Sequence, residues 1–365
     1  MECVMNNLET SRAEIDRIDR EMAELFEKRM LACADVAAYK KEHALPIFDP
    51  ERENSVIANR AKLVADPTLR EYYTEYIKDV MNISKDYQSR LISGIKVVYS
   101  GCEGAFGYIA AKKLYPSSEL YACSDFTDAY TAVESGKYDC ALLPIENSYA
   151  GDVGVVTDLM FSGSLYVNRM VELEVVHNLI AKPGAELKKI KKVISHPQAL
   201  EQCEDYIKAH GFETVAFSNT ALAAKYVKEE CDDTCAAIAS ADTAELFGLE
   251  ILEDKINTSS ANTTRFAVFS RAQNLPLPDS KNENEHFILL FTTKNEAGAL
   301  AQALNIIGAH NYNMRTLRSR PMKDLIWSYY FFVEAEGNIN TENGRNMLTE
   351  LSAVCARLKL VGTYN

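Results

Sequence analysis

The first 93 residues of this 365-residue chain contain no glycine, and Gly94 is the first one. Within this stretch, apolar residues recur at intervals of three and four, which places them on one face of a helix. Glycine weakens a helix interior more than any residue except proline. The stretch is therefore predicted to be all helical over residues 1–93.

Two cations fall on the apolar face of the first predicted helix. At about 100° per residue, one set of side chains forms a stripe, namely Ile18, Met22, Leu25, Phe26, Cys33 and Val36. Arg29 lies in this stripe, Lys40 lies about 20° from Arg29, and Arg12 lies about 100° away, toward a different neighbour. A single cation there would extend its head group to water. Two cations on a face that should be buried favour a binding site for an anion.

The sequence PIFDPERE at 46–53 predicts the start of a second helix. Asp49 is a suitable N-cap and Pro50 a suitable first residue, which places Arg52 and Glu53 in the first turn. These charges would either form an ion-paired cap or bind hydroxyl groups of a ligand.

Residues 94–272 alternate short apolar runs with helical patterns, which is typical of α/β architecture. The expected strands are IKVVYS, CALLPIE, VVHNLIA, KKVISHP, AAIAS and FAVFS. The prolines and polar tail of RAQNLPLPDSKNENE mark a linker, after which HFILLFTT, a helix over 297–309 and WSYYFFVEAE predict a small α+β module. The expected organisation is a helical domain at 1–93, an α/β domain at 94–272, a linker at 273–285 and a module at 286–365.

Composition argues against several classes of protein. The formal net charge of −13 argues against nucleic acid as a partner. The apolar runs are too short to span a bilayer, and the first residues lack the pattern of a signal peptide. The nine cysteines include no CxxC pair, and Cys231 and Cys235 have no histidine pair nearby, so no metal site is expected. Scattered thiols of this kind indicate a cytoplasmic protein.

An arginine enters a buried strand in the middle region. The sequence SSANTTRFAVFS at 259–270 passes from small polar residues through Arg265 into an apolar run. Arginine seldom lies beside a buried strand without a partner. Either Arg265 is a solvated cation, or Thr263, Thr264 and Arg265 face an anionic ligand at the end of the strand.

Residues 8–90 resemble the all-helical chorismate mutases. Eight positions carry the family's residue type: Arg12, Arg29, Lys40, Asp49, Arg52, Glu53, Ser84 and Gln88. The last two are one helical turn apart and share a face. The resemblance implies a dimer of long three-helix chains in which the partner subunit supplies Arg12 to the site.

Chorismate rearranges to prephenate by a unimolecular pericyclic shift, so the site needs no nucleophile. It must hold a dicarboxylate in its compact diaxial form and stabilise negative charge on the breaking ether oxygen. By resemblance, Arg12 and Arg29 bind the carboxylates, and Lys40 and Gln88 bind the ether oxygen. By the same resemblance, Asp49 and Glu53 lie toward the hydroxyl end of chorismate. Arg52 and Ser84 complete the set of residues around the substrate. Lys40, Glu53 and Gln88 are the expected catalytic residues.

Four motifs in the middle region together resemble prephenate dehydratase. They occur in the family's order over about 170 residues: YSGCEGAFGYIAA (99–111), PIENSYAGDV (144–153), SHPQAL (195–200) and NTTRF (262–266). The resemblance implies two α/β lobes, like a periplasmic solute-binding protein. Its site would lie in the cleft between them, where open α/β sheets bind ligands.

Prephenate loses its ring hydroxyl and carbon dioxide together, and the reaction needs a proton donor but no metal or cofactor. By resemblance, Thr264 is the donor or relay to the departing hydroxyl, and Glu146 is the alternative proton source if a dry site keeps it protonated. Arg265 would hold the anion or pair with Glu146. The expected substrate-positioning residues are Asn147, Ser148, Ser195, Gln198 and Thr263.

The glycine motif departs from the common G-x-x-G-T-F-S form. Ala105 stands for the threonine and Gly107 for the serine, which removes a hydroxyl at a helix start, although backbone N–H groups there still bind anions. His177 is interpreted as a core histidine.

Residues 286–361 resemble an ACT domain, a βαββαβ module that binds amino acids at a dimer interface. The landmarks EAGAL and LRSRP provide the expected effector residues, Gly298, Ala299, Leu300, Arg318, Ser319, Arg320 and Pro321. Relatives with phenylalanine feedback typically carry proline at position 297 and glutamate at position 318, where this chain has Ala297 and Arg318. The resemblance implies L-phenylalanine as effector, and the alternative is a dimerisation unit without a ligand.

Together these resemblances predict a bifunctional chorismate mutase–prephenate dehydratase that forms phenylpyruvate on the route to phenylalanine. It would act as a homo-oligomer, either a dimer or a tetramer. Two alternatives stay open: the same scaffold acting on arogenate, and a non-catalytic ligand-sensing cleft fused to an active mutase.

Overall fold

The structure is a computed structural model that describes residues 2–259, 261–278, 280, 282, 284–322 and 328–365. The chain forms two compact units, Met1–Ile95 and Lys96–Asn365. Among the described residues, no helix combines the length and the apolar character that crossing a membrane would need.

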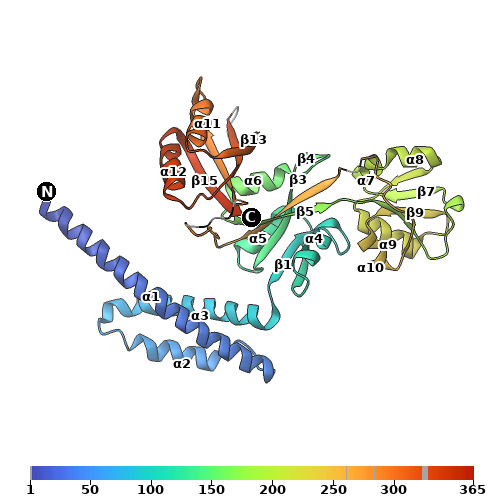
Figure 1. Ribbon diagram of the computed structural model, residues 1–365. Helices are drawn as coiled ribbons and strands as arrows, with labels where there is room; N and C mark the ends of the chain where they lie inside the picture. Colours follow the sequence, from blue (N-terminus) through green and yellow to red (C-terminus); the bar gives the residue numbers. More distant parts are fainter. Residues whose placement is uncertain (1, 260, 279, 281, 283, 323–327) are drawn as a thin grey trace. The chain divides into compact units, whose positions relative to one another are not determined.

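The first unit is helical, as its sequence predicts (Figure 1). In chain order it contains α1 (Glu2–Glu42), α2 (Pro50–Ala61), the short 3-10 helix η1 (Pro67–Leu69) and α3 (Arg70–Ser93). Asp49 caps α2 as predicted, because its carboxylate accepts a hydrogen bond from the backbone N–H of Arg52 at 3.0 Å. Gly94 follows α3 with a φ of 81°, a conformation that glycine adopts most readily, so the helix ends at the boundary between the units.

The second unit begins with an α/β lobe whose sheet is mixed. Its elements are β1 (Lys96–Ser100), α4 (Phe106–Leu114), β2 (Glu119–Cys123), α5 (Phe126–Glu134), β3 (Cys140–Asn147), β4 (Gly151–Asp152), α6 (Gly154–Ser162), β5 (Tyr166–Glu174) and β11 (Thr263–Ser270). β1 lies parallel between β2 and β3, and β11 lies antiparallel between β3 and β5.

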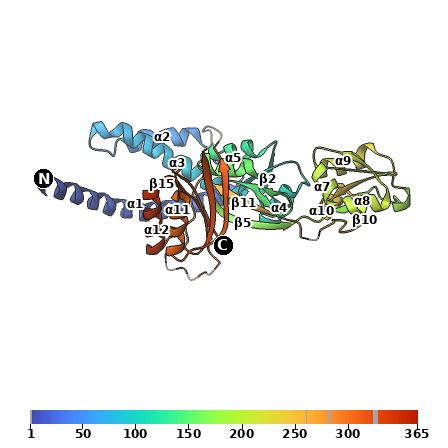
Figure 2. The same cartoon turned by 90° about the horizontal axis from the view of Figure 1, so that it is seen from above.

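A second α/β lobe is inserted between β5 and β11. Its elements are β6 (Asn178–Ala181), η2 (Leu187–Lys189), β7 (Lys192–Ser195), α7 (Pro197–Gln202), α8 (Glu204–His210), β8 (Glu213–Ala216), α9 (Thr220–Glu230), β9 (Cys235–Ala239), α10 (Ala241–Phe247) and β10 (Glu250–Glu253). The sheet has the order β10-β6-β9-β7-β8, with α7 and α8 on one face and α9 and α10 on the other. β5 and β11 lead to and from this lobe (Figures 1 and 2). The two-lobed arrangement confirms the predicted fold class.

The C-terminal part of the second unit has the βαββαβ order of the predicted ACT fold. It contains β12 (His286–Thr293), α11 (Ala299–Ala309), β13 (Asn313–Pro321), β14 (Tyr329–Glu336), α12 (Glu342–Val354) and β15 (Cys355–Tyr364). α11 and α12 pack against the sheet β13-β14-β12-β15. We refer to residues 286–365 as the C-terminal module.

The sheet of the C-terminal module joins the sheet of the first lobe at one glycine. Gly362 on β15 pairs with Val167 on β5. A Cβ atom on Gly362 would lie 1.9 Å from the carbonyl oxygen of Val167, so any side chain there would push the two strands apart. Glycine at this position therefore permits the close approach of the two strands.

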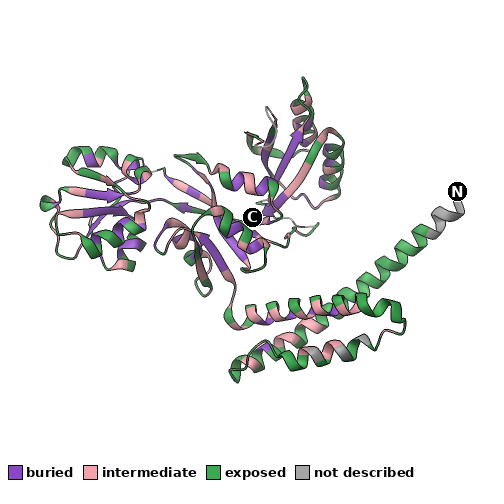
Figure 3. Cartoon of the chain, turned by 180° about the vertical axis from the view of Figure 1, so that it is seen from behind, coloured by how far each residue is buried: buried purple, intermediate pink, exposed green. Residues whose placement is uncertain are grey.

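The apolar stripe of α1 is not buried within one chain, which corrects the expectation from its helical periodicity. The side chains of Ile18, Met22, Leu25, Phe26 and Val36 are between 41% and 63% exposed, and Figure 3 shows most of α1 as exposed. The periodicity correctly identified a face that needs a partner, but α2 and α3 do not provide one along the N-terminal half of α1.

Candidate active sites

Arg29 and Ser84 form the centre of the candidate mutase site. The guanidinium of Arg29 on α1 donates a hydrogen bond to the hydroxyl of Ser84 on α3. That hydroxyl in turn donates to the backbone carbonyl of Val80 at 2.6 Å. Ser84 is buried and Arg29 half-buried, so the cation is held below the protein surface as the helical projection predicted.

Gln88 lies one turn after Ser84 and is also buried. Its side-chain Oε1 has no hydrogen-bond partner among the described residues. A buried carboxamide oxygen without a partner is unfavourable by about 1–3 kcal/mol. Lys40 donates to the carbonyl of Ile47 at 2.7 Å, which ties the end of α1 to the segment before α2.

Glu53 has a partner that the sequence analysis missed. Its carboxylate on α2 pairs with the ammonium of Lys85 on α3 at 2.8 Å, and the same ammonium lies 5.0 Å from the ring centroid of Phe48. Helical spacing alone does not bring Lys85 to Glu53, because the contact depends on how α2 packs against α3. The start of α2 therefore contains the predicted N-cap, Asp49, and an inter-helix ion pair formed by Glu53.

Arg12 is exposed on α1, far from the other predicted mutase residues. Seventeen residues separate it from Arg29 on one continuous helix, which corresponds to about 26 Å along the axis. An arginine side chain does not reach across that distance. Arg12 therefore does not serve the Arg29 site of its own chain.

A cavity of about 550 Å³ between the two lobes of the second unit contains predicted dehydratase residues. Three of them contribute to its described lining, Asn147, Gln198 and Thr264. Other polar residues on its walls are Ser100, Ser124, Asp152, His177, His196, Gln202, Ser218, Asn219 and Thr220. The described lining contains no lysine or arginine.

Thr264 and Asn147 lie side by side on neighbouring strands. The register of β11 with β3 pairs the two residues, and Asn147 Nδ2 donates to Thr264 Oγ1 at 2.9 Å. Asn147 Oδ1 accepts from the backbone N–H groups of Tyr149 and Ala150 at 3.0 and 2.8 Å, which fixes the orientation of the amide. Since Thr264 Oγ1 already accepts from Asn147, its own proton is free for another acceptor.

A chain of amides continues from this pair to His177. Asn147 Nδ2 also donates to Asn262 Oδ1, and Asn262 Nδ2 donates to Gln202 Oε1, both at 2.9 Å. His177 Nε2 lies 2.9 Å from the same Gln202 oxygen, so this nitrogen carries the proton. His177 Nδ1 is then an acceptor, and it has no partner among the described residues.

His177 is thus buried, as its interpretation as a core histidine requires, and it also borders the cavity. Burial lowers its pKa below the usual value, although the hydrogen bond to Gln202 opposes the shift. The His177 residue is only 2% exposed, although it contributes to the cavity wall. The contact between His177 and Gln202 was missed because His177, which precedes β6, meets α7 only after the second lobe folds.

The first turns of α4 and α9 contribute to the cavity wall. Ala105 precedes α4 without a side-chain cap, and Ala105, Phe106 and Gly107 all belong to the lining. Asn219 caps α9, accepting from Ala221 N–H at 2.7 Å. Helix N-termini carry unpaired N–H groups and partial positive charge, so these two first turns place partial positive charge at the wall of a cavity whose described lining contains no lysine or arginine.

Arg265 and Glu146 do not belong to the described cavity lining, which corrects the expectation that they contact the substrate there. Arg265 makes a bidentate pair with Glu334 at 2.9 and 2.8 Å and lies 3.4 Å from Glu146. Successive side chains on a strand point to opposite faces, so Arg265 cannot face the same way as Thr264. The sequence also allowed Arg265 to pair with Glu146, and the structure shows that contact.

Three further predicted substrate-binding residues have structural partners instead. Ser195 is buried and its hydroxyl donates to the Ile238 carbonyl at 2.7 Å. Ser148 donates to the Ala261 carbonyl at 2.8 Å and accepts from the Thr263 N–H at 2.9 Å. None of the three, Ser148, Ser195 and Thr263, belongs to the described lining.

The expected effector residues divide into two groups. Gly298 has a φ of 84° and precedes α11, where Ala299 is the first residue and Leu300 packs on the module core. On β13, Ser319 and Pro321 are exposed, while Arg318 and Arg320 contact the first lobe. Arg318 and Arg320 are therefore engaged within the chain.

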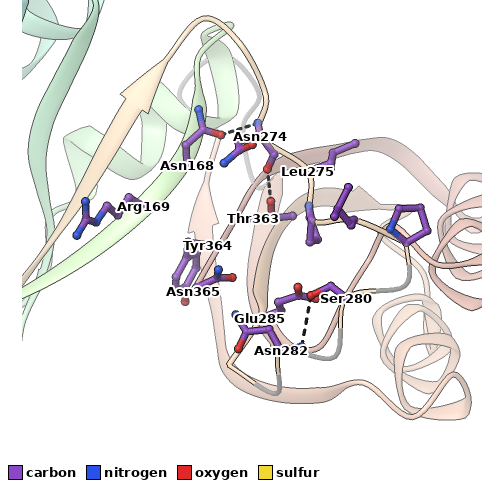
Figure 4. Close-up of a pocket in the computed structure, with 13 residues that line it drawn as sticks. Asn168, Arg169, Asn274, Leu275, Ser280, Asn282, Glu285, Thr363, Tyr364 and Asn365 are labelled. Carbon is purple, nitrogen blue, oxygen red and sulfur yellow. Dashed lines mark hydrogen bonds between the residues drawn. The ribbon is translucent and has the colours of Figure 1, made fainter. Parts of the chain in front are cut away.

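A larger cavity of about 710 Å³ lies between β5, the segment after β11 and the end of β15 (Figure 4). Its walls include carboxamides of four asparagines and the buried carboxylate of Glu285. None of the residues singled out from the sequence contributes to its described lining. The predicted dehydratase residues therefore direct attention to the cavity between the lobes.

Two segments of the chain match known families. Residues 11–89 match chorismate mutase type II, and residues 97–274 match prephenate dehydratase. A bifunctional chorismate mutase/prephenate dehydratase of Neisseria gonorrhoeae is 31% identical over 353 residues, which cover 96% of this chain and 94% of the relative. The chain belongs to the bifunctional chorismate mutase/prephenate dehydratase family.

This bifunctional enzyme acts in phenylalanine biosynthesis, converting chorismate to prephenate and prephenate to phenylpyruvate. Arogenate dehydratase 2 of Petunia hybrida is 32% identical, with 74% of this chain and 72% of the relative covered. A prephenate dehydratase structure from Arthrobacter aurescens, in complex with L-Phe, is 26% identical with a TM-score of 0.68, covering 74% of this chain and 89% of that one. The matches confirm the family prediction and favour it over the arogenate and sensor alternatives.

Proposed function

We propose that the dehydratase reaction takes place in the 550 Å³ cavity, with Thr264 as the proton-donating group. The observation that carries this proposal is the 2.9 Å hydrogen bond from Asn147 to Thr264. Because Asn147 occupies the acceptor site of the hydroxyl, the Thr264 proton is directed elsewhere, and the ring hydroxyl of prephenate is a suitable acceptor. As that hydroxyl leaves, its hydrogen bond to Thr264 strengthens and lowers the barrier.

The two carboxylates of prephenate would be bound by dipoles instead of cations. The first turns of α4 and α9 provide N–H groups, and Gly107 in the first turn of α4 belongs to the cavity lining. Closure of the two lobes would exclude water and strengthen each of these interactions. Gln198 and Gln202 would orient the substrate from the second lobe.

The proposal is tested by giving purified protein chorismate alone and following prephenate and phenylpyruvate separately. Transient prephenate followed by phenylpyruvate is the expected result. Prephenate that accumulates without phenylpyruvate would contradict the dehydratase site, and a parallel assay with arogenate would then show whether that substrate is used instead.

We propose that the mutase site contains Arg29, Lys40, Ser84 and Gln88 of one chain together with Arg12 of a second copy. Arg12 is about 26 Å from Arg29 along α1, which supports sharing between subunits. The exposed stripe of α1 supplies a matching interface, because Leu8, Ile15, Ile18, Met22 and Leu25 are all exposed at the spacing of a helix–helix seam. Asp49, Arg52 and Glu53 at the start of α2 would surround the hydroxyl end of chorismate.

We further propose that residues 286–365 form an ACT regulatory domain, after a linker at 273–285, and bind L-phenylalanine between two copies. The L-Phe complex of the Arthrobacter aurescens relative supports this assignment. Gly298, Ala299, Leu300, Ser319 and Pro321 are the proposed effector residues. The cytoplasm remains the proposed location, in keeping with the free thiols of the eight described cysteines.

A further inference from the structure

Two arginines of β13 contact the first lobe beside the dehydratase cavity. Arg318 pairs with Glu146 at the end of β3, and Arg320 pairs with Asp152 on β4 at 2.9 Å. The two arginines are two residues apart, so strand geometry directs both toward the same face. The C-terminal module therefore holds the β3–β4 hairpin at two points.

This hairpin also carries the wall of the cavity. Asn147 directly follows Glu146 on β3, and the register pairs Asn147 with Thr264 and Glu146 with Arg265. One face of these two strands thus presents Asn147 and Thr264 to the cavity. The opposite face presents Glu146 and Arg265 to the C-terminal module.

The groups on the opposite face form an alternating chain of charges. Arg318 contacts Glu146, Glu146 contacts Arg265, and Arg265 contacts Glu334 of β14. Burial alone would raise the pKa of Glu334, but hydrogen bonds from Arg265 and Tyr364 bring that pKa below its usual value. Glu334 at one end of this series of ion pairs is 2% exposed, so its position is fixed by packing. The side chain of Arg318 at the other end is 23% exposed, so it has more freedom to move.

We propose that Arg318 is a positioning residue for the dehydratase reaction, acting through Glu146 on the Asn147–Thr264 pair. The proposal rests on the proposed role of Thr264. By neutralising Glu146, Arg318 fixes the end of β3, so Asn147 holds the Thr264 hydroxyl in the direction of the substrate. A displacement of about 1 Å in such a group lowers turnover by up to about a hundredfold.

The test compares Arg318→Met, Glu146→Gln and the double variant in the full-length enzyme. Arg315→Met is the matched control, because Arg315 lies on the same strand and contacts Glu336 and His286 of the C-terminal module. Each protein is assayed for dehydratase kcat and KM with prephenate and for mutase kcat with chorismate.

We expect Arg318→Met to lower dehydratase kcat about tenfold or more, with the KM for prephenate and mutase kcat within about twofold of wild type. Because both residues act through one contact, the double variant should lose no more than the more impaired single variant. Arg318→Lys should restore most of the lost turnover, since it keeps the charge. Arg315→Met should match wild type.

Unchanged dehydratase kcat in Arg318→Met, or strictly additive losses in the double variant, would overturn the proposal. So would parallel losses of mutase and dehydratase activity with a lowered melting temperature, which would mark a purely structural contact. Thr264→Ala in the same series separates this inference from the proposed site. Full activity of Thr264→Ala refutes the site itself, whereas an inactive Thr264→Ala beside an unaffected Arg318→Met refutes only the role of Arg318.

Discussion

Thr264 is the residue on which the dehydratase proposal depends most directly. We expect Thr264→Ala to lower dehydratase turnover by about two to three orders of magnitude while mutase turnover stays near wild type. Thr263→Ala is the matched comparison, because Thr263 does not belong to the described cavity lining. Separate prephenate and chorismate assays measure both effects, and an equal loss in the two variants would contradict the placement of these threonines.

The placement of Arg265 could have been predicted from the sequence. Thr264 and Arg265 are consecutive on a strand, so period-2 alternation places them on opposite faces, and they cannot both face one ligand. The motif NTTRF identified the strand end that borders the cavity, and Thr264 is the one of its two threonines that belongs to the described lining. The contact between His177 and Gln202 could not be found in this way, because no spacing rule joins the residue before β6 to the end of α7.

His177 also determines a pH dependence of stability. Burial lowers its pKa in the folded enzyme below the usual value of the unfolded chain, so protons bind more readily to the unfolded state. Its contribution to stability is therefore present above the unfolded pKa and is lost as pH falls toward the folded pKa. We expect the free energy of unfolding to decrease more between about pH 7.5 and about pH 5.5 in wild type than in His177→Leu. Equal slopes in denaturant titrations of the two proteins would contradict this.

At the scale of elements, strands that are buried on both faces were predictable and half-exposed strands were not. The expected runs CALLPIE, FAVFS and HFILLFTT correspond to β3, β11 and β12. β5, β10 and β13 were missed because their exposed faces carry charged side chains, as in NMRTLRSRP, and lack an apolar run. The run VVHNLIA was only partly strand, since β6 begins at Asn178, after the connection between lobes.

The junction of β15 with β5 provides a test at the same scale. We expect Gly362→Ala to lower the free energy of unfolding of the second unit by about 1–3 kcal/mol, because the added Cβ overlaps a backbone oxygen. Gly308→Ala is the matched control, since a Cβ there meets no described heavy atom within 4 Å, and alanine in a helix should stabilise by about 0.5–1 kcal/mol. Chemical denaturation measures the free energy of unfolding of both variants. A Gly362→Ala protein as stable as wild type would show that β15 and β5 can separate without a loss of stability.

At the scale of the whole molecule, the shared mutase site predicts complementation between inactive subunits. Arg12→Ala and Arg29→Ala should each lose most mutase activity, since an unpaired carboxylate in a desolvated pocket is unfavourable by a few kcal/mol. After mixing and subunit exchange, about half of the dimers are heterodimers, and each contains one intact site. About a quarter of wild-type activity should therefore return. No recovery despite demonstrated exchange would mean that Arg12 acts within its own chain.

The lack of lysine and arginine in the described cavity lining also affects the rate at which substrate arrives. Prephenate is a dianion and the chain carries a net charge of −13, so the long-range field slows their encounter. Salt shortens the range of that repulsion. We therefore expect dehydratase kcat/KM to rise about twofold between about 20 and about 200 mM NaCl, whereas mutase kcat/KM, which depends on Arg29 and Lys40, falls. Initial rates at low substrate measure both trends, and a parallel fall would show that cations beyond the described lining, such as Arg320 next to Asp152, dominate the encounter.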